Sequence, residues 1–185
     1  MSIYITSDLH FNHNKDFIYK VRGFDSVYDM NEIIVNNWNS IIDPEDDVYV
    51  LGDLMLGNNE DGIKLIKQLK GNIHIILGNH DTDQRIELYN DCYNVVEIVY
   101  ATLLKYKGYT FYLSHYPTLT SNVDDKGLKH RVINLCGHTH TKDKFEHMSL
   151  GTIYHCEVDA HDMKPVNLDT IIKDLEDFRF VKWSR

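Results

Sequence analysis

The amino-acid sequence predicts an α/β protein with a mixed β-sheet, and three observations support this class. Short apolar runs rich in Ile, Val, Tyr and Phe recur along the chain, as is typical of buried strands. Segments with helical spacing of apolar residues lie between them in the first half, which favours βαβ units. Two adjacent strand runs meet at Lys107 and Gly108, a turn that indicates an antiparallel hairpin beside parallel strands.

We expect a strand at each short apolar run. The runs are Ile3–Thr6 and residues 48–51, 73–77, 95–104, 110–113, 132–135 and 153–158. Three helices are expected from periodicity. The first begins with a capping-box pattern, Asp29 followed by Glu32, before an apolar stripe that ends at Ile42. The second and third carry apolar residues on one face, within residues 63–69 and 168–178.

Length and composition limit the class of protein. A chain of 185 residues suits a single domain, residues 1–185, with a full hydrophobic core. Its formal net charge of −9 argues against an extended nucleic-acid surface. Its three cysteines form no C-x-x-C pair, which argues against a disulfide framework. The N-terminus has no signal-peptide pattern, and no apolar run reaches the roughly 20 residues of a membrane span. We therefore expect a cytoplasmic protein without a membrane partner.

Histidine is abundant, at 11 of 185 residues, and its placement is informative. Polar side chains able to bind metals follow five of the expected strands: Asp8 and His10; Asp53; Asn79, His80 and Asp81; His115; His138 and His140. Ligands bind at the carboxyl ends of strands in α/β sheets, so these five ends could converge on one site. Two of the pairs have i, i+2 spacing, which in an extended segment places both side chains on the same face.

The residue types in these clusters indicate a transition-metal site. Imidazole nitrogen together with carboxylate and amide oxygen suits Zn, Mn, Fe, Co or Ni, whereas Ca and Mg prefer oxygen ligands alone. The candidate ligands are too many for one tetrahedral ion and would fill two ions that share a bridging carboxylate. Ion pairs about 3.5–4 Å apart are used for phosphoester displacement. Each cluster alone is a weak signal, and their joint occurrence supports one site.

The ordered motifs D-x-H, G-D, G-N-H-D, H and G-H-T-H resemble those of the calcineurin-like metallophosphoesterases. The resemblance implies a four-layer αββα sandwich of two mixed β-sheets flanked by helices, with a dinuclear metal site at the C-terminal ends of the strands. It implies that one ion is held by Asp8, His10 and His140. It assigns the other ion to Asn79, His115 and His138, with Asp53 bridging the two.

The same resemblance implies the chemistry of the site. A hydroxide bridging two divalent transition-metal ions (Mn, Fe, Zn, Ni or Co, with Mn favoured) would attack the phosphorus. His80 would contact the phosphate or protonate the leaving oxygen, and Asp81 would orient His80. The expected activity is therefore that of a metal-dependent phosphomonoesterase or phosphodiesterase, and the motifs do not separate the two.

A narrower resemblance to small phage and bacterial members of the family rests on S-D-L-H-F-N-H-N, R-G-F and the N-N-W segment. Those members frequently have Pro where this chain has Gly23. The resemblance implies that Asn12, His13 and Arg22 border the site and bind substrate, with Arg22 gripping a phosphate. The alternatives are that Arg22 pairs with an acid and that His13 caps a loop. His161, in a further matching segment, would approach the site or support it. No direct function is expected for His74, His130, His147 and His155.

The expected substrate is a small phosphoester or a nucleotide, because 185 residues leave no room for a large cap over the site. The alternative is a non-catalytic binding module on the same fold. Such a module would be expected to lose metal ligands or the working histidine, whereas every motif position is filled here. A monomer and a small homo-oligomer both stay open.

Overall fold

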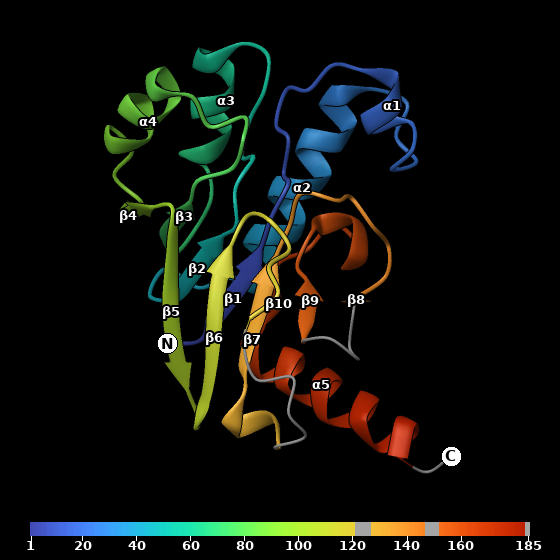
Figure 1. Ribbon diagram of the computed structural model, residues 1–185. Coiled ribbons are helices and arrows are strands. Elements are labelled where there is room, and N and C mark those ends of the chain that lie inside the picture. Colours follow the sequence, from blue (N-terminus) through green and yellow to red (C-terminus); the bar gives the residue numbers. More distant parts are fainter. Residues whose placement is uncertain (121–126, 147–151, 184–185) are drawn as a thin grey trace.

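The computed structural model of the protein describes residues 1–120, 127–146 and 152–183. Over these residues the chain forms two mixed β-sheets flanked by helices (Figure 1). In the first sheet, of order β10-β1-β2-β3-β4, the strands β1 to β4 are parallel and β10 is antiparallel to β1. These strands are β1 (Ile3–Thr6), β2 (Asp47–Val50), β3 (Asn72–Ile76), β4 (Val95–Val99) and β10 (Val166–Asn167).

The second sheet has the order β5-β6-β7-β9-β8. Its central strands β6, β7 and β9 are parallel, and β5 and β8 pair antiparallel at the two edges. The strands are β5 (Ala101–Tyr106), β6 (Tyr109–Ser114), β7 (Val132–Cys136), β8 (Phe145–Glu146) and β9 (Ile153–His155). The β5–β6 turn has Lys107 and Gly108 with φ of 48° and 82°, which confirms the predicted hairpin.

Two apolar cores hold the layers together. The helices are α1 (Asp16–Tyr19), α2 (Val27–Ile41), α3 (Asn59–Ile66), α4 (Asp83–Asn90), α5 (Leu168–Trp183), η1 (Leu128–His130) and η2 (Val158–Ala160). One core joins α2, α3 and α4 to a face of the first sheet, with Trp38 and Val50 fully buried in it. The other joins the opposite face of that sheet to the second sheet and α5, around Ile5, Phe111 and Ile171. Strands covered on both sides explain why the strand segments are rich in apolar residues.

The fold class is as predicted, a mixed α/β architecture with two mixed sheets between helices, but some elements differ. The expected strand 95–104 is wrong as a single strand: it bends at Tyr100, so that β4 ends one sheet and β5 begins the other. Helix α2 begins earlier than predicted, because the Ser26 side chain caps it by accepting from the Asp29 N–H. The short elements α1, α4, β8 and β10 were not predicted. No helix in the described ranges has the length and apolar character needed to cross a membrane.

Candidate metal centre

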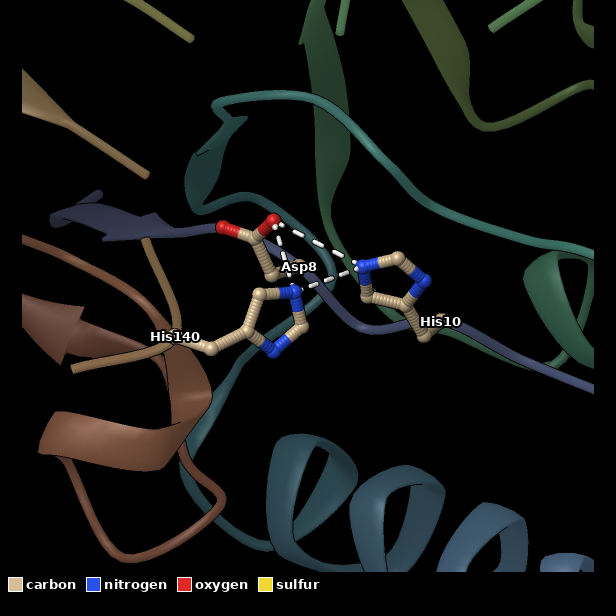
Figure 2. Close-up of side chains that lie close together, drawn as sticks. All are labelled: Asp8, His10 and His140. Atoms are coloured by element: carbon tan, nitrogen blue, oxygen red, sulfur yellow. Dashed lines mark hydrogen bonds and ion pairs between the residues drawn. The ribbon is translucent and has the colours of Figure 1, made fainter. Parts of the chain in front are cut away.

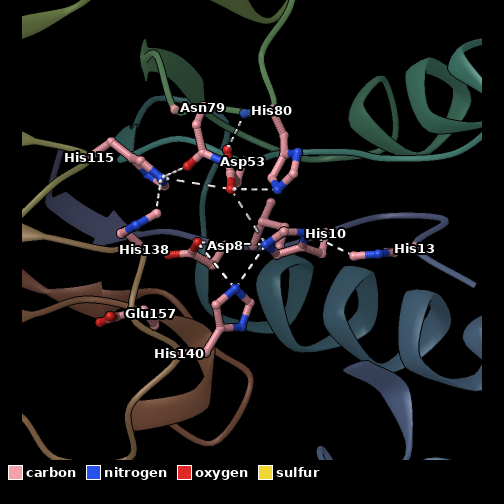
Figure 3. A network of polar contacts seen from close by, with 12 residues as sticks. Asp8, His10, His13, Asp53, Asn79, His80, His115, His138, His140 and Glu157 are labelled. Carbon is pink, nitrogen blue, oxygen red and sulfur yellow. Dashed lines mark hydrogen bonds and ion pairs between the residues drawn. The ribbon is translucent and has the colours of Figure 1, made fainter. Parts of the chain in front are cut away.

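The carboxyl ends of five parallel strands meet at one edge of the two sheets, as expected. β1, β2 and β3 are neighbours in the first sheet, and β6 and β7 are neighbours in the second. The polar residues that follow these strands face one another (Figure 3). The side chains of Asp8, His10, Asp53 and His115 are buried, each at most 3% exposed. Asn79 and His138 are exposed, and His80 and His140 are partly exposed.

The backbone that carries these residues is not extended. Asp8, His10, Asp53, His138 and His140 all have left-handed φ values, between 50° and 77°. Such values are uncommon outside glycine and cluster at functional sites. The expectation that i, i+2 pairs point the same way along an extended segment is therefore wrong. In the two loops that carry these pairs, the side chains converge because alternate residues have a left-handed backbone conformation.

Asp8, His10 and His140 form the first cluster (Figure 2). The Nε2 atoms of His10 and His140 lie 3.0 Å apart, at 3.6 and 3.5 Å from Asp8 Oδ1. Asp8 Oδ1 is buried and has no hydrogen-bond partner. Because a buried carboxylate oxygen without a partner is costly, a cation between these three atoms accounts for the arrangement.

Asn79, His115 and His138 form the second cluster (Figure 3). His115 Nε2 lies 2.9 Å from Asn79 Oδ1 and 3.2 Å from His138 Nδ1. His115 Nδ1 lies 2.8 Å from the Leu51 carbonyl oxygen. That oxygen can only accept, so Nδ1 carries the proton and the Nε2 lone pair faces the cluster. The Nε2 lone pair and the Asn79 amide oxygen are both acceptors, so a cation between them would relieve their repulsion.

Asp53 lies between the two clusters. Its Oδ2 atom is 3.6 Å from His10 Nε2 in the first cluster and 3.7 Å from His115 Nε2 in the second. Its other oxygen, Oδ1, accepts from the His80 N–H at 2.9 Å. This leaves Oδ2 as the oxygen that faces both clusters.

The glycines of the G-D and G-H-T-H motifs allow the side chains of the two clusters to lie close together. A Cβ on Gly52, which has φ of +90°, would lie 2.4 Å from His115 Nδ1 and 2.7 Å from the Gly78 Cα. A Cβ on Gly137 would lie 2.3 Å from Asp8 Oδ2. The side chains of the centre therefore occupy space that any larger residue would fill.

The charge states of Asp8 and His10 suit a cation, whereas the pKa of His140 is raised overall, because the effect of burial is outweighed by Asp159 and Asp8. Burial alone would raise the pKa of Asp8, but interactions with His10 and His140 lower it overall. Burial lowers the pKa of His10 despite its contact with Asp8. A charged carboxylate beside a neutral imidazole is the protonation state that metal binding requires.

His80 stands at the open side of the centre. Its side chain is 41% exposed, and its Nε2 lies 3.9 Å from Asp53 Oδ2. Asp81 does not orient it as expected: the Asp81 carboxylate accepts from the N–H groups of Asp53 and Gly78 and from the Tyr89 hydroxyl. Asp81 therefore holds the loop of Asp53, and His80 is held through its backbone.

The three expected substrate-binding residues have different surroundings. Arg22 is 1% exposed and donates to Asp159 and to the Asp8 and Leu9 carbonyl oxygens, so it pairs with an acid. His13 borders the pocket, its Nδ1 lies 3.2 Å from His10 Nδ1, and burial lowers its pKa to about 4. Asn12 lies outside this pocket, contrary to expectation, because its side chain pairs with Asn31 between α2 and α3.

Two buried acids support the centre and were not found from the sequence. Asp159 Oδ2 lies 3.3 Å from His140 Nδ1, so it orients a candidate metal ligand. Glu157, fully buried, accepts from the backbone N–H and hydroxyl of Thr139, between the two histidines of G-H-T-H. Asp159 lies two residues before His161 in the segment V-D-A-H-D (residues 158–162), but only His161 in that segment was predicted to approach or support the site.

The remaining histidines lie away from the centre. His161 bonds to the His155 carbonyl oxygen, and His155 pairs with Glu157 and Glu146. His74 pairs with Asp47 and Glu97 on the first sheet. His130 ends η1, and His147 is outside the described residues.

A pocket of about 380 Å³ opens over the centre. Its polar lining includes His10, Asp53, Asn79, His80, His138 and His140, and Phe17, Ile18 and Val21 add an apolar part. The centre is therefore accessible to a small molecule.

Comparison with known proteins agrees with this geometry. The sequence matches the calcineurin-like phosphoesterase superfamily domain over residues 1–162. MJ1445, an uncharacterized protein of Methanocaldococcus jannaschii, is 32% identical over 185 residues, covering 97% of this chain and 94% of that protein. The gene 66 protein of Mycobacterium phage D29 is 26% identical over 205 residues, covering 95% and 98%.

A solved structure shares the fold. A protein of unknown function from Aquifex aeolicus, AQ665, superposes with a TM-score of 0.67 at 23% identity, covering 93% of this chain and 98% of that one. The motif residues lie within the matched range 1–162, which includes both sheets except for the short strand β10. The chain belongs to the calcineurin-like phosphoesterase superfamily.

Proposed function

We propose that the chain is a phosphoester hydrolase that uses two divalent transition-metal ions, with Mn favoured. The position of Asp53 Oδ2, within 3.7 Å of a histidine nitrogen in each cluster, is the observation that carries this proposal. The first ion would be held by Asp8, His10 and His140, the second by Asn79, His115 and His138, and Asp53 would contact both. Imidazole, carboxylate and amide donors match transition metals.

The charge of the centre supports phosphate binding by an acidic protein. Two divalent ions with the carboxylates of Asp8 and Asp53 leave a local charge of about +2. When bound, the ions supply Lewis-acid activation of the phosphoryl group and of water. The formal net charge of −9 over the whole chain does not oppose this, because the positive potential is local.

The chain's own residues then position the substrate. The partly exposed ring of His80 lines the pocket at its open side, where it can donate a hydrogen bond to a phosphate oxygen or a proton to the leaving oxygen. The backbone N–H of His80 donates to Asp53 Oδ1, and Arg85 donates to the His80 carbonyl oxygen. These contacts fix the backbone of His80 relative to the carboxylate of Asp53, which would contact both ions. Arg22 also lines the pocket, and its bonds to the Asp8 and Leu9 carbonyl oxygens make it a positioning residue for the loop of Asp8.

Two variants test the proposal by separating metal binding from turnover. Mn-loaded wild-type protein should hydrolyse 4-nitrophenyl phosphate or bis(4-nitrophenyl) phosphate and bind about two ions per chain. His80→Asn should keep both ions and lose about 100-fold or more in turnover. Asp53→Asn should lose metal, measured by calorimetry. His74→Asn is the matched control, because His74 lies on β3 outside the pocket and should change neither property.

The same assay, extended to a cyclic phosphoester, contains the refuting outcome. A folded, Mn-loaded protein that hydrolyses no phosphomonoester, phosphodiester or cyclic phosphoester would overturn the enzyme proposal. It would favour the alternative, a non-catalytic binding module on the same fold.

A further inference from the structure

One wall of the pocket is apolar and faces solvent. Phe17 on α1 is 66% exposed, and Val21 just beyond α1 is 64% exposed. Both side chains line the same pocket as His80 and His140. Large apolar side chains at a pocket rim are a common sign of a binding surface, because exposing them to water is unfavourable.

Contacts on both sides hold this wall in place. Ile18, between Phe17 and Val21, is buried in the core formed with α2. The residue after Val21 is Arg22, whose guanidinium donates to the Asp8 and Leu9 carbonyl oxygens. The apolar wall is therefore fixed relative to the loop that carries the first metal cluster.

The wall begins one side chain away from the candidate ligands. His13 packs edge-to-face on Phe17, with ring centroids 5.6 Å apart. On its other side the His13 ring lies 5.2 Å from the His10 ring, again between centroids. A phosphoryl group at the metal centre would thus have its attached organic group within reach of Phe17.

The rest of the rim is polar. Lys142, Asn79, His138 and Asp159 line the other parts of the pocket. An apolar group attached to the phosphorus therefore has one favourable direction, toward Phe17 and Val21. A flat ring suits this surface, because an aromatic face and a branched aliphatic side chain can both pack against it.

We infer that Phe17 and Val21 select phosphoesters that carry a flat aromatic ring next to the phosphate over those that carry a small alkyl group. The inference rests on the proposed function, since the phosphoryl group is placed by the metal centre. It adds a substrate class to that function and assigns it to two residues outside the family motifs.

Phosphonates test the inference without any difference in leaving-group reactivity. The dissociation constants of phenylphosphonate and methylphosphonate would be measured by calorimetry on the Mn-loaded protein. Wild-type protein should bind phenylphosphonate about tenfold more tightly, the gain expected when a ring buries roughly 60 Å² of apolar surface. Phe17→Ala should reduce this preference to about twofold, and Val21→Ser should reduce it partly, with methylphosphonate affinity unchanged.

Tyr93→Ala provides the control, because Tyr93 is an aromatic residue that is 80% exposed and does not line this pocket. Equal binding of the two phosphonates by wild-type protein, or an unchanged preference in Phe17→Ala, would overturn the inference while leaving the hydrolase proposal in place. Binding of neither phosphonate, together with no phosphoester hydrolysis, would overturn the proposed function and the inference with it.

Discussion

Arg22 and Asp159 form a buried ion pair behind His140, and Asp159→Asn removes its negative charge with little change in side-chain volume. The Nη2 atom of Arg22 lies 2.7 Å from Asp159 Oδ2, and the two side chains are 1% and 6% exposed. The same carboxylate orients His140. Asp159→Asn should therefore lower the stability of the metal-free protein.

The expected magnitude follows from two estimates. Burial alone would raise the pKa of Asp159, but hydrogen bonds with His140 and Arg22 lower it from 3.8 to about 2. A carboxyl group whose pKa falls on folding adds stability above its unfolded pKa, here about 2 kcal/mol, which is lost as the pH falls from about 4 to about 2. Leaving the Arg22 charge buried and unpaired costs about 3–5 kcal/mol. We expect a loss of about 2–5 kcal/mol near neutral pH, the range that the two estimates span.

Urea unfolding in excess chelator measures this loss, with fluorescence of the fully buried Trp38 as one reporter. With a slope of about 2 kcal/mol per molar urea, the midpoint should fall by about 1–2.5 M. Asp16→Asn is the control, because Asp16 and Lys20 form a solvent-exposed pair and should contribute little.

A double variant makes the prediction sharper. Arg22→Met combined with Asp159→Leu removes both buried charges and should be more stable than Asp159→Asn. If the midpoint of Asp159→Asn shifts no more than that of Asp16→Asn, the pair does not support the fold as argued.

Two further predictions concern the backbone and a buried histidine. Gly52→Ala should reduce Mn affinity by about tenfold or more in calorimetry, because the added Cβ would collide with His115. Gly23→Ala is the control and should leave Mn affinity unchanged, because Gly23 is also left-handed but has open space at its Cβ position. Equal losses of affinity in the two variants would assign the effect to backbone strain. Burial alone would lower the pKa of His155, but Glu157 raises it overall, so its protonated form adds stability that is lost as the pH rises through the folded-state pKa. Glu157→Gln should therefore narrow the difference between urea midpoints at about pH 6 and about pH 9, and an unchanged difference would contradict this assignment.

The sequence predicted the parts of the fold that depend on burial. β1 was predicted with its observed bounds, Ile3–Thr6, and β2, β3 and β7 to within one residue at each end, because strands that pack in the core are rich in apolar residues. The run 95–104 was equally apolar, and nothing local marks the bend at Tyr100 where the chain changes sheets. Helix α4 was missed because Tyr89 is its only buried residue, so it has no apolar stripe.

The candidate ligands could be identified because metal chemistry restricts them to a few residue types placed after strands. The supporting acids could not be identified in this way. Asp159 is one of 28 acidic residues, and its role depends on a fold that brings it to His140 and Arg22. A carboxylate that orients a histidine needs no fixed spacing from it, so only the tertiary structure reveals the pair.

The left-handed backbone of the centre connects residue type, fold and chemistry. Aspartate and histidine tolerate positive φ better than most residues, and they also bind transition metals. Asp8, His10, Asp53, His138 and His140 therefore meet both demands at once. Sparsely populated backbone conformations cost on the order of 1 kcal/mol or more each, so five of them are comparable to the net stability of a domain, about 5–15 kcal/mol. Such strain persists only where the surroundings enforce it. The Asp53 N–H donates to the Asp81 carboxylate, and the His138 N–H donates to the Asp8 carboxylate. Each bond holds a left-handed residue in place from the end of another strand.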